Sequence, residues 1–351
     1  YQTGFYGGDA DNFTYPRYNV DVSMFRLYEN DKPADTPNYL KWSPKGSADG
    51  ELVFTTGHPG STQRLNTLAH LKYRRDTAMP FSIASLEMRE AAVKKWMALS
   101  DENARQAKTE LFGIQNGLKS QRGQLGGLQD PALMAKKEAA EKRLRTELAK
   151  NPAKQKELGD AWDTIEKSLE VARQIDAERN FLTNAAGLNS TLFAQARQLV
   201  RAAYNPPAAG TSGRGTGGRG GQGAPAGTPG GGRGGAQPAV NIAREKLNLT
   251  ESLAFMQKHL GADHAIVKRV LGGKTPEARA AELVDGTRLT DSEIRNLLQA
   301  GGKATIDIST DPMIVLARAV EADAQAAAKR FDEEVTAVQA AAYPKIGQAV
   351  F

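Results

Sequence analysis

The sequence predicts an α+β protein in which a β-rich N-terminal region precedes a large helical region. Residues 1–75 contain frequent glycines and prolines, clustered aromatic side chains and little helical periodicity. From about Ser82 the chain becomes rich in Ala, Leu, Glu, Lys and Arg at helical spacing, and this pattern ends near Ala342. Because the helical block follows a predicted strand and precedes an apolar segment, 343–351, we expect it to be an insertion in a β domain.

The length and composition exclude several classes of protein. At roughly 150 residues per domain, 351 residues suggest about two domains. No apolar run approaches the roughly 18–20 residues that a membrane span requires. The absence of cysteine excludes disulfides, thiol catalysis and Cys-ligated metal sites. Since the chain begins at Tyr1 without a Met and stops at Phe351 in an apolar segment, we expect an internal piece of a longer protein.

Two strands are expected in the β-rich region. The segment Val20–Tyr28 partly alternates, with Val20, Val22 and Met24 apolar on one parity. A loop is expected at Asp31-Lys-Pro, and a second strand over 51–56 ends in the turn Gly57-His-Pro-Gly-Ser61.

Helices separated by Gly and Pro breakers are expected in the second region. Asp311-Pro312 reads as an N-cap followed by Pro in the first turn, and Thr290 or Asp291 caps another helix. The expected ranges are 82–99, 102–128, 131–150, 154–204, 242–271, 276–284, 291–299 and 312–342.

One segment of the helical region, 206–239, has a different composition. It holds 14 of the 35 glycines and three arginines with no acidic residue, so removing it lowers the net charge from +6 to +3. We expect a disordered insert because so few apolar side chains cannot offset the entropy of ordering. Arg-Gly tracts can bind RNA, but this one has few arginines and no aromatic residue, so we expect no nucleic-acid partner.

Asp21 is the strongest candidate for a functional side chain. A carboxylate inside an apolar strand is costly unless it is hydrogen-bonded or charge-paired. A polar lead-in, an Asp and a hydrophobic run ending in a basic residue is the kind of strand on which chymotrypsin-like proteases carry their triad Asp. The alternative is a structural ion pair with Arg17 or Arg26.

Other motifs give no metal or nucleophile site. A calcium loop starting at Asp9 fails because Thr14 and Val20 stand where Gly and Glu are required. The four histidines show no metal-site spacing, and no Gly-x-Ser-x-Gly segment occurs. We therefore expect no metal and no cofactor, and the chain by itself cannot complete a Ser-His-Asp triad.

Three motifs together resemble the bacterial dipeptidyl-peptidase 7/11 family of serine exopeptidases. These motifs are Gly7-Gly-Asp-Ala-Asp-Asn-Phe-Thr-Tyr-Pro-Arg17, Asp21-Val-Ser-Met-Phe-Arg-Leu-Tyr28 and Phe54-Thr-Thr-Gly-His-Pro-Gly-Ser-Thr-Gln-Arg64. The resemblance implies a chymotrypsin-like double β-barrel with a large inserted helical domain. Residues 1–75 would be part of the catalytic barrel, 76–342 the helical cap domain, and 343–351 a return to the catalytic domain.

The resemblance also implies roles for individual residues. Asp21 matches the triad Asp, and Asn12 matches a residue that holds the free N-terminus of the substrate. Phe13 stands where members often have Trp. Asn116, in Ile114-Gln-Asn-Gly-Leu-Lys119, resembles the Asn that the helical domain contributes to the same site. His58 occupies a position often held by Asn or Tyr, so the triad His is expected upstream of Tyr1 and the Ser beyond Phe351.

The implied function is release of N-terminal dipeptides from oligopeptides by Ser-His-Asp acyl transfer, with the 351-residue chain inactive by itself. The implied location is the periplasm or outside the cell, with a signal peptide upstream, and a homodimer fits the family. Two alternatives are a non-catalytic descendant that binds peptides or a partner, and nucleic-acid binding through 206–239.

Overall fold

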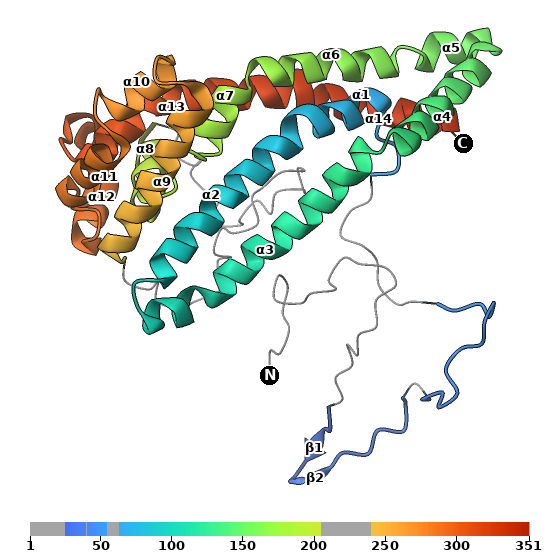
Figure 1. The fold of residues 1–351 in the computed structure, drawn as a ribbon, viewed down its shortest axis with the longest axis horizontal. Coiled ribbons are helices and arrows are strands. Elements are labelled where there is room, and N and C mark those ends of the chain that lie inside the picture. The colour runs from blue at the N-terminus through green and yellow to red at the C-terminus, as the bar shows by residue number, and fades with distance from the viewer. Residues whose placement is uncertain (1–24, 40, 55–62, 205–239, 351) are drawn as a thin grey trace. The chain divides into compact units, whose positions relative to one another are not determined.

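The computed structural model describes residues 25–39, 41–54, 63–204 and 240–350. The chain divides into two compact units with a boundary between Arg64 and Leu65. The larger unit contains all the described helices (Figure 1).

The described part of the smaller unit contains one short hairpin. Strand β1 (Tyr28–Glu29) pairs antiparallel with β2 (Lys32–Pro33), with Tyr28 opposite Pro33. Asn30 and Asp31 join them with φ angles of 52° and 61°. Two successive residues with positive φ are typical of the type I′ turn, whose twist matches that of the flanking strands.

The prediction of an α+β fold containing part of a β-barrel is wrong for this chain. This two-residue pair is the only β structure among the described residues, and 51–54 form no strand. A strand is stabilised by a hydrogen-bonded partner and by burial of one face. Among the described residues β1 has only the two-residue β2 as a partner, and apolar side chains of this region are not buried, since Phe25 and Phe54 are 88% and 87% exposed. The described part of the chain is a helical domain.

The described part of the larger unit consists of helices interrupted by three π-helical turns. Their bounds are α1 (Leu68–Tyr73), η2 (Arg74–Ala78), α2 (Met79–Met97), α3 (Asp101–Gln129), α4 (Pro131–Ala149), α5 (Pro152–Leu158), α6 (Ala161–Gln174), α7 (Asp176–Glu178), η3 (Arg179–Thr183), α8 (Thr191–Tyr204), α9 (Ile242–Leu260), α10 (Ala265–Leu271), α11 (Pro276–Gly286), α12 (Ser292–Ile308), α13 (Pro312–Phe331), η4 (Asp332–Thr336) and α14 (Ala337–Val350).

Side-chain caps begin most of the helices that were expected from the sequence. Asp311 accepts hydrogen bonds from the backbone N–H groups of Met313 and Ile314, with Pro312 in the first turn as predicted. Asp291, rather than Thr290, caps α12. These caps satisfy N–H groups that the helix leaves without partners.

Both ends of the helical region lie beyond the expected limits. Helix α1 begins at Leu68, and η2 joins it to α2 without a break. Helix α14 continues past Pro344 to Val350. A proline inside a helix removes one hydrogen bond. Burial of Ala342 and Ile346, each 3% exposed, offsets that loss. The assignment of 343–351 to a catalytic domain stays a prediction.

The long expected helix over 154–204 is divided in the structure. The largest break separates η3 from α8 at residues 184–190. Gly187 lies in this break, and a Cβ atom there would lie 2.9 Å from the Met256 side chain of α9. The close approach of α9 therefore requires glycine at this position. Because this contact joins residues far apart in the sequence, helical periodicity cannot predict the break.

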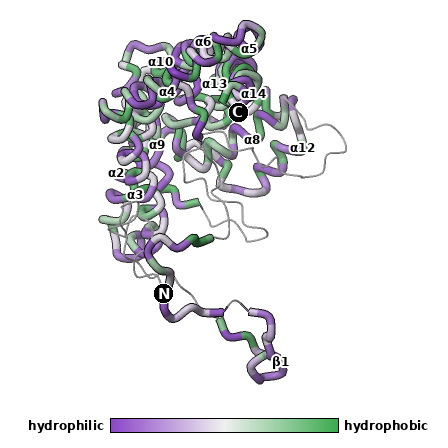
Figure 2. Tube along the Cα trace, turned by 90° about the vertical axis from the view of Figure 1, so that its right-hand side faces the viewer, coloured by the Kyte–Doolittle hydropathy of each residue, from purple (hydrophilic) through white to green (hydrophobic). Residues whose placement is uncertain are grey.

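Three hydrophobic clusters form the core among the described residues of the larger unit. The first joins η3 with α8–α13, and the second joins α1, α4, α5, α6 and α14. The third lies between α2 and α3. Hydrophobic and hydrophilic residues alternate along most helices (Figure 2), as expected for helices with one buried face.

Candidate functional site

Asn116 is the only predicted site residue within the described part of the chain. Asp21, Asn12 and Phe13 lie outside the described residues. The roles of all four residues therefore stay predictions, and α3 is the described element on which the candidate site can be built.

Helix α3 is held against α2 by an apolar interface. Leu86 and Trp96 of α2 pack with Ile114 and Leu118 of α3. The backbone of α3 approaches α2 closely at Gly117, where a Cβ atom would lie 3.4 Å from Leu86 Cδ1. The two helices lie side by side (Figure 1).

Polar contacts on both sides of this interface fix the rotation of α3. Gln115 Nε2 donates to Glu90 Oε1 at 2.9 Å, and Gln121 Nε2 donates to Ser82 Oγ at 2.8 Å. Burial opposes ionisation of Glu90, but hydrogen bonds from Lys94 and Gln115 outweigh it and lower the pKa of its carboxyl group. Glu90 is therefore an ionised anchor at neutral pH.

Two ion pairs connect helix α9 to the α2–α3 pair. Lys95 Nζ lies 2.6 Å from Glu251 Oε1, and Arg244 pairs with Glu110. With α2 packed against both α3 and α9, α3 is a rigid element of the larger unit.

This packing directs Asn116 away from α2. Residues 114 and 118 are each two positions from Asn116, which corresponds to roughly 200° around a helix. Since Ile114 and Leu118 are buried against α2, Asn116 lies on the opposite face, where its side chain is half-buried. Phe112 lies one turn earlier on that face, with Lys108 Nζ 5.6 Å from its ring centre.

The chemistry of this face suits recognition of a polar group. A side-chain amide offers an oxygen acceptor and two N–H donors. The oxygen can accept a hydrogen bond from an ammonium group, and such charge-assisted bonds are stronger than neutral ones. A rigid helix supports such a contact because it fixes the position of the amide.

A hollow lined by described residues lies elsewhere and was not expected. It lies between α8, η3, α13 and η4, and α3 contributes none of its lining residues. Beside it, Arg197 and Arg201 of α8 share the buried carboxylate of Glu321 of α13. The sequence carries a weak signal for this cluster, since two arginines four residues apart interrupt the apolar side of 191–204.

Metal-binding groups and membrane-spanning helices can be looked for only among the described residues. There, no group of three His, Cys, Asp or Glu side chains could hold a metal ion. The helices described between residues 68 and 350 are too short or too polar to cross a bilayer.

Comparison with known sequences identifies the family. The sequence model of the family described as peptidase S46 matches residues 1–351. An Asp/Glu-specific dipeptidyl-peptidase of Shewanella putrefaciens is 27% identical over 211 residues, covering 57% of this chain and 28% of the relative. Dipeptidyl-peptidase 7 of Phocaeicola vulgatus is 32% identical over 131 residues, covering 34% of this chain and 18% of the relative. The chain thus matches less than a third of the length of these relatives.

Comparison with solved structures extends the similarity to the fold. The crystal structure of Porphyromonas endodontalis DPP11 in complex with the dipeptide Arg-Glu has a TM-score of 0.64 to this chain at 17% sequence identity. The match covers 98% of this chain and 50% of that chain. Agreement between a sequence match over all 351 residues and a shared fold leads to one conclusion: the chain belongs to the peptidase S46 family.

Proposed function

We propose that the whole protein is a serine-type dipeptidyl peptidase that releases dipeptides from the free N-terminus of oligopeptides. The family match over residues 1–351 is the observation that carries this proposal, and the matched relatives are named dipeptidyl-peptidases. The position of Asn116 on the rigid α3, facing away from α2, supports it.

In this proposal Asn12 and Asn116 accept hydrogen bonds from the α-ammonium group of the substrate. Holding the ammonium group at a fixed site places the peptide bond after the second residue at the catalytic serine. The serine hydroxyl attacks that carbonyl carbon while a histidine takes its proton and then gives it to the leaving amine. Water hydrolyses the acyl-enzyme and releases the dipeptide.

Asp21 orients the histidine in this proposal. Its carboxylate accepts a hydrogen bond from the imidazole Nδ1–H, which fixes the tautomer and stabilises the imidazolium. The histidine and serine come from parts of the protein outside the 351 residues, and no cofactor takes part.

Paired substrates test the proposed activity. The complete protein is offered dipeptidyl chromogenic substrates with a free N-terminus and the same substrates N-acetylated. We expect release from the free substrates alone, because acetylation removes the charge that Asn12 and Asn116 bind. Equal release from both sets would contradict the amine-binding site. No release from either set by folded protein would favour a non-catalytic peptide-binding protein.

The substitution Asp21→Asn tests the role of the proposed triad residue. In the complete protein it should lower kcat by about 10³–10⁴-fold with folding intact, because the histidine then adopts the wrong tautomer. Asp31→Asn, in the β1–β2 turn, is the matched control and should leave kcat unchanged. Near-normal turnover by the Asp21 variant would contradict the assignment.

We also propose that the protein acts in the periplasm or outside the cell, and as a homodimer. The resemblance to exported peptidases supports this location. Fractionation of the native host followed by immunodetection tests this location, and retention in the cytoplasm would contradict it.

Light scattering of the purified complete protein measures its oligomeric state, and a monomer would contradict the dimer.

A further inference from the structure

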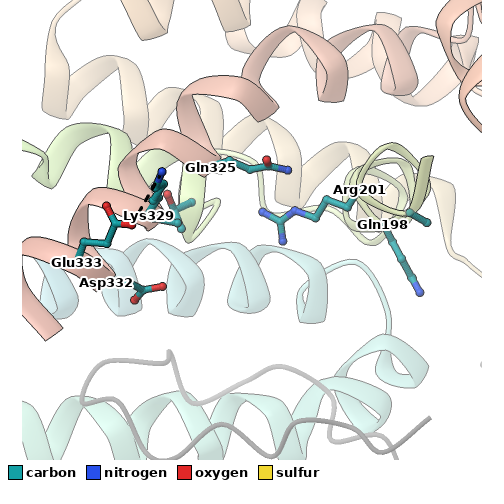
Figure 3. A pocket seen from close by; sticks show the side chains of 9 residues that line it. Gln198, Arg201, Gln325, Lys329, Asp332 and Glu333 are labelled. Atoms are coloured by element: carbon teal, nitrogen blue, oxygen red, sulfur yellow. Dashed lines mark ion pairs between the residues drawn. The ribbon is translucent and has the colours of Figure 1, made fainter. Parts of the chain in front are cut away.

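The hollow beside α8 has features of a binding site that the proposed peptidase activity does not use. Its volume is about 820 Å³, and Thr183, Gln325 and Asp332 are among its lining residues. A second hollow of about 290 Å³ shares Gln198 and Arg201 with it. Figure 3 shows Arg201 and Gln325 extending toward one another across the larger hollow.

The backbone around these hollows is irregular. The π-helical turns η3 and η4 both contribute to the wall of the larger hollow. Ala185, which lines the smaller hollow, has a φ of 55°, a conformation that costs a non-glycine residue energy. π-helical turns and strained residues occur often at functional sites.

A buried cluster with excess positive charge forms the floor. Arg197 Nε lies 2.8 Å from Glu321 Oε2, and Arg201 Nε lies 2.5 Å from Glu321 Oε1. The side chains of Arg197 and Glu321 are only 8% and 7% exposed. Two guanidinium groups share one carboxylate, so the cluster carries one excess positive charge, and the Arg201 side chain that contributes to it is half-exposed.

One nitrogen of this cluster has no hydrogen-bond partner among the described residues. Arg197 Nη1 donates to the Thr183 carbonyl oxygen at 3.0 Å, but the buried Arg197 Nη2 donates to nothing. Buried donors are almost always satisfied in native proteins, and an unsatisfied one is destabilising, more so when it is charged. The cluster therefore lacks one hydrogen-bond acceptor.

The residues around the cluster restrict which ligand can supply the missing hydrogen-bond acceptor. Leu188 and Phe193 line the smaller hollow beside Arg197, so a ligand there needs an apolar body. The carboxylates Asp332 and Glu333 line the larger hollow together with the cations Arg201 and Lys329, so the hollow offers no net positive charge to a doubly charged anion such as phosphate. A carboxylate carries a single charge, and its planar geometry suits the guanidinium group.

We propose that the two hollows form a binding site for a small carboxylate with an apolar body, whose carboxylate oxygens accept hydrogen bonds from Arg197 and Arg201. The site is independent of the proposed peptidase activity. Short peptides and simple carboxylic acids share this chemistry.

Titration calorimetry on the 351-residue chain tests the site with N-acetyl-leucine and its neutral analogue N-acetyl-leucinamide. We expect the acid to bind at least about tenfold more tightly than the amide, because only the acid can form charged hydrogen bonds with the arginines. Tenfold is the smallest change in affinity expected from one such bond. Equal binding of the two compounds, or no binding of the acid, would overturn the proposal. This comparison uses the unaltered protein, so it does not depend on a variant that folds.

The substitution Arg201→Gln locates the site. It keeps a donor for Glu321 but removes the charge, so affinity for the acid should fall at least about tenfold. Arg145→Gln is the matched control, because both arginine side chains are 45% exposed and Arg145 pairs with Asp163 on a distant surface. Unchanged affinity in Arg201→Gln, or an equal loss in both variants, would overturn the proposal.

The dipeptide Leu-Leu distinguishes the two sources of the ligand. Tighter binding of Leu-Leu than of N-acetyl-leucine would support a peptide ligand, since Asp332 and Glu333 can pair with its free amine. Equal affinity would support a carboxylate site that accepts simple acids. Failure of both compounds to bind would overturn the proposal.

Discussion

At the scale of single residues, the packing of α3 decides what Asn116 can contact. Its neighbours Gln115 and Gly117 are used within the α2–α3 interface, through Glu90 and Leu86. Asn116 faces the other way because of the helical repeat. Its sequence motif suggested a binding role, and its place on a rigid helix makes that role testable.

Asn116→Ala should weaken recognition of a free N-terminus. Loss of one charge-assisted hydrogen bond should lower kcat/KM of the complete protein for free N-terminal substrates by about 10–100-fold. Steady-state kinetics on the chromogenic dipeptide substrates measures this. Gln106→Ala, which removes an exposed amide bonded to Glu102 on the same helix, is the matched control. Equal kcat/KM values in the two variants would exclude Asn116 from the site.

At the scale of secondary-structure elements, α8 depends on a cap that another helix provides. The buried Glu245 of α9 accepts hydrogen bonds from the backbone N–H groups of Thr191 and Leu192 and from the Ser190 hydroxyl, the last at 2.6 Å. A carboxylate at a helix N-terminus also interacts favourably with the helix dipole. Helix α8, which carries Arg197 and Arg201, is therefore positioned by α9.

Glu245→Ala should destabilise the chain more than removal of a surface carboxylate. It leaves buried donors at the start of α8 unsatisfied, so we expect the free energy of unfolding to fall by about 2–4 kcal/mol. Urea unfolding followed by far-UV circular dichroism measures this. Glu251→Ala removes a carboxylate of the same helix whose partner Lys95 is exposed, and should cost less than about 1 kcal/mol. Similar losses in the two variants would contradict the capping role.

At the scale of the whole helical unit, a buried pair joins its first and last helices. His70 Nδ1 of α1 lies 2.7 Å from the Tyr343 hydroxyl of α14. Burial, with a smaller contribution from Arg74, lowers the pKa of His70 to about 4, and burial raises the pKa of Tyr343 to about 12. Both side chains are therefore neutral in the folded protein at pH 7.

This pair should make the helical unit sensitive to acid. Below about pH 6.5 the unfolded chain binds a proton at His70 while the folded chain does not, so stability falls between about pH 6.5 and pH 4. The loss should reach roughly 3 kcal/mol. Urea unfolding at pH 8, 6 and 4 should show a smaller loss in His70→Gln, which keeps a hydrogen-bonding side chain. Equal pH dependence in wild type and His70→Gln would exclude this pair as its cause.

Much of the helical region could be predicted because its signals are local. The expected helix over 131–150 corresponds to α4 (Pro131–Ala149), and the predicted cap at Asp311 is confirmed. Caps, prolines and helical periodicity act within a few residues, so the sequence alone contains them. The β fold was wrong because a strand requires a partner, and alternation over a few residues cannot establish one.

The sequence by itself determined the family, most helices and a candidate role for Asn116. The tertiary structure alone decided which face of α3 carries that residue, where α8 begins, and that Arg197, Arg201 and Glu321 share one site. Glu321 lies more than 100 positions along the chain from the two arginines of that site, and Glu245 lies more than 50 positions from Thr191 at the start of α8. Such contacts exist only once the helices pack, because burial makes an unpaired charge or donor costly enough to select its partner.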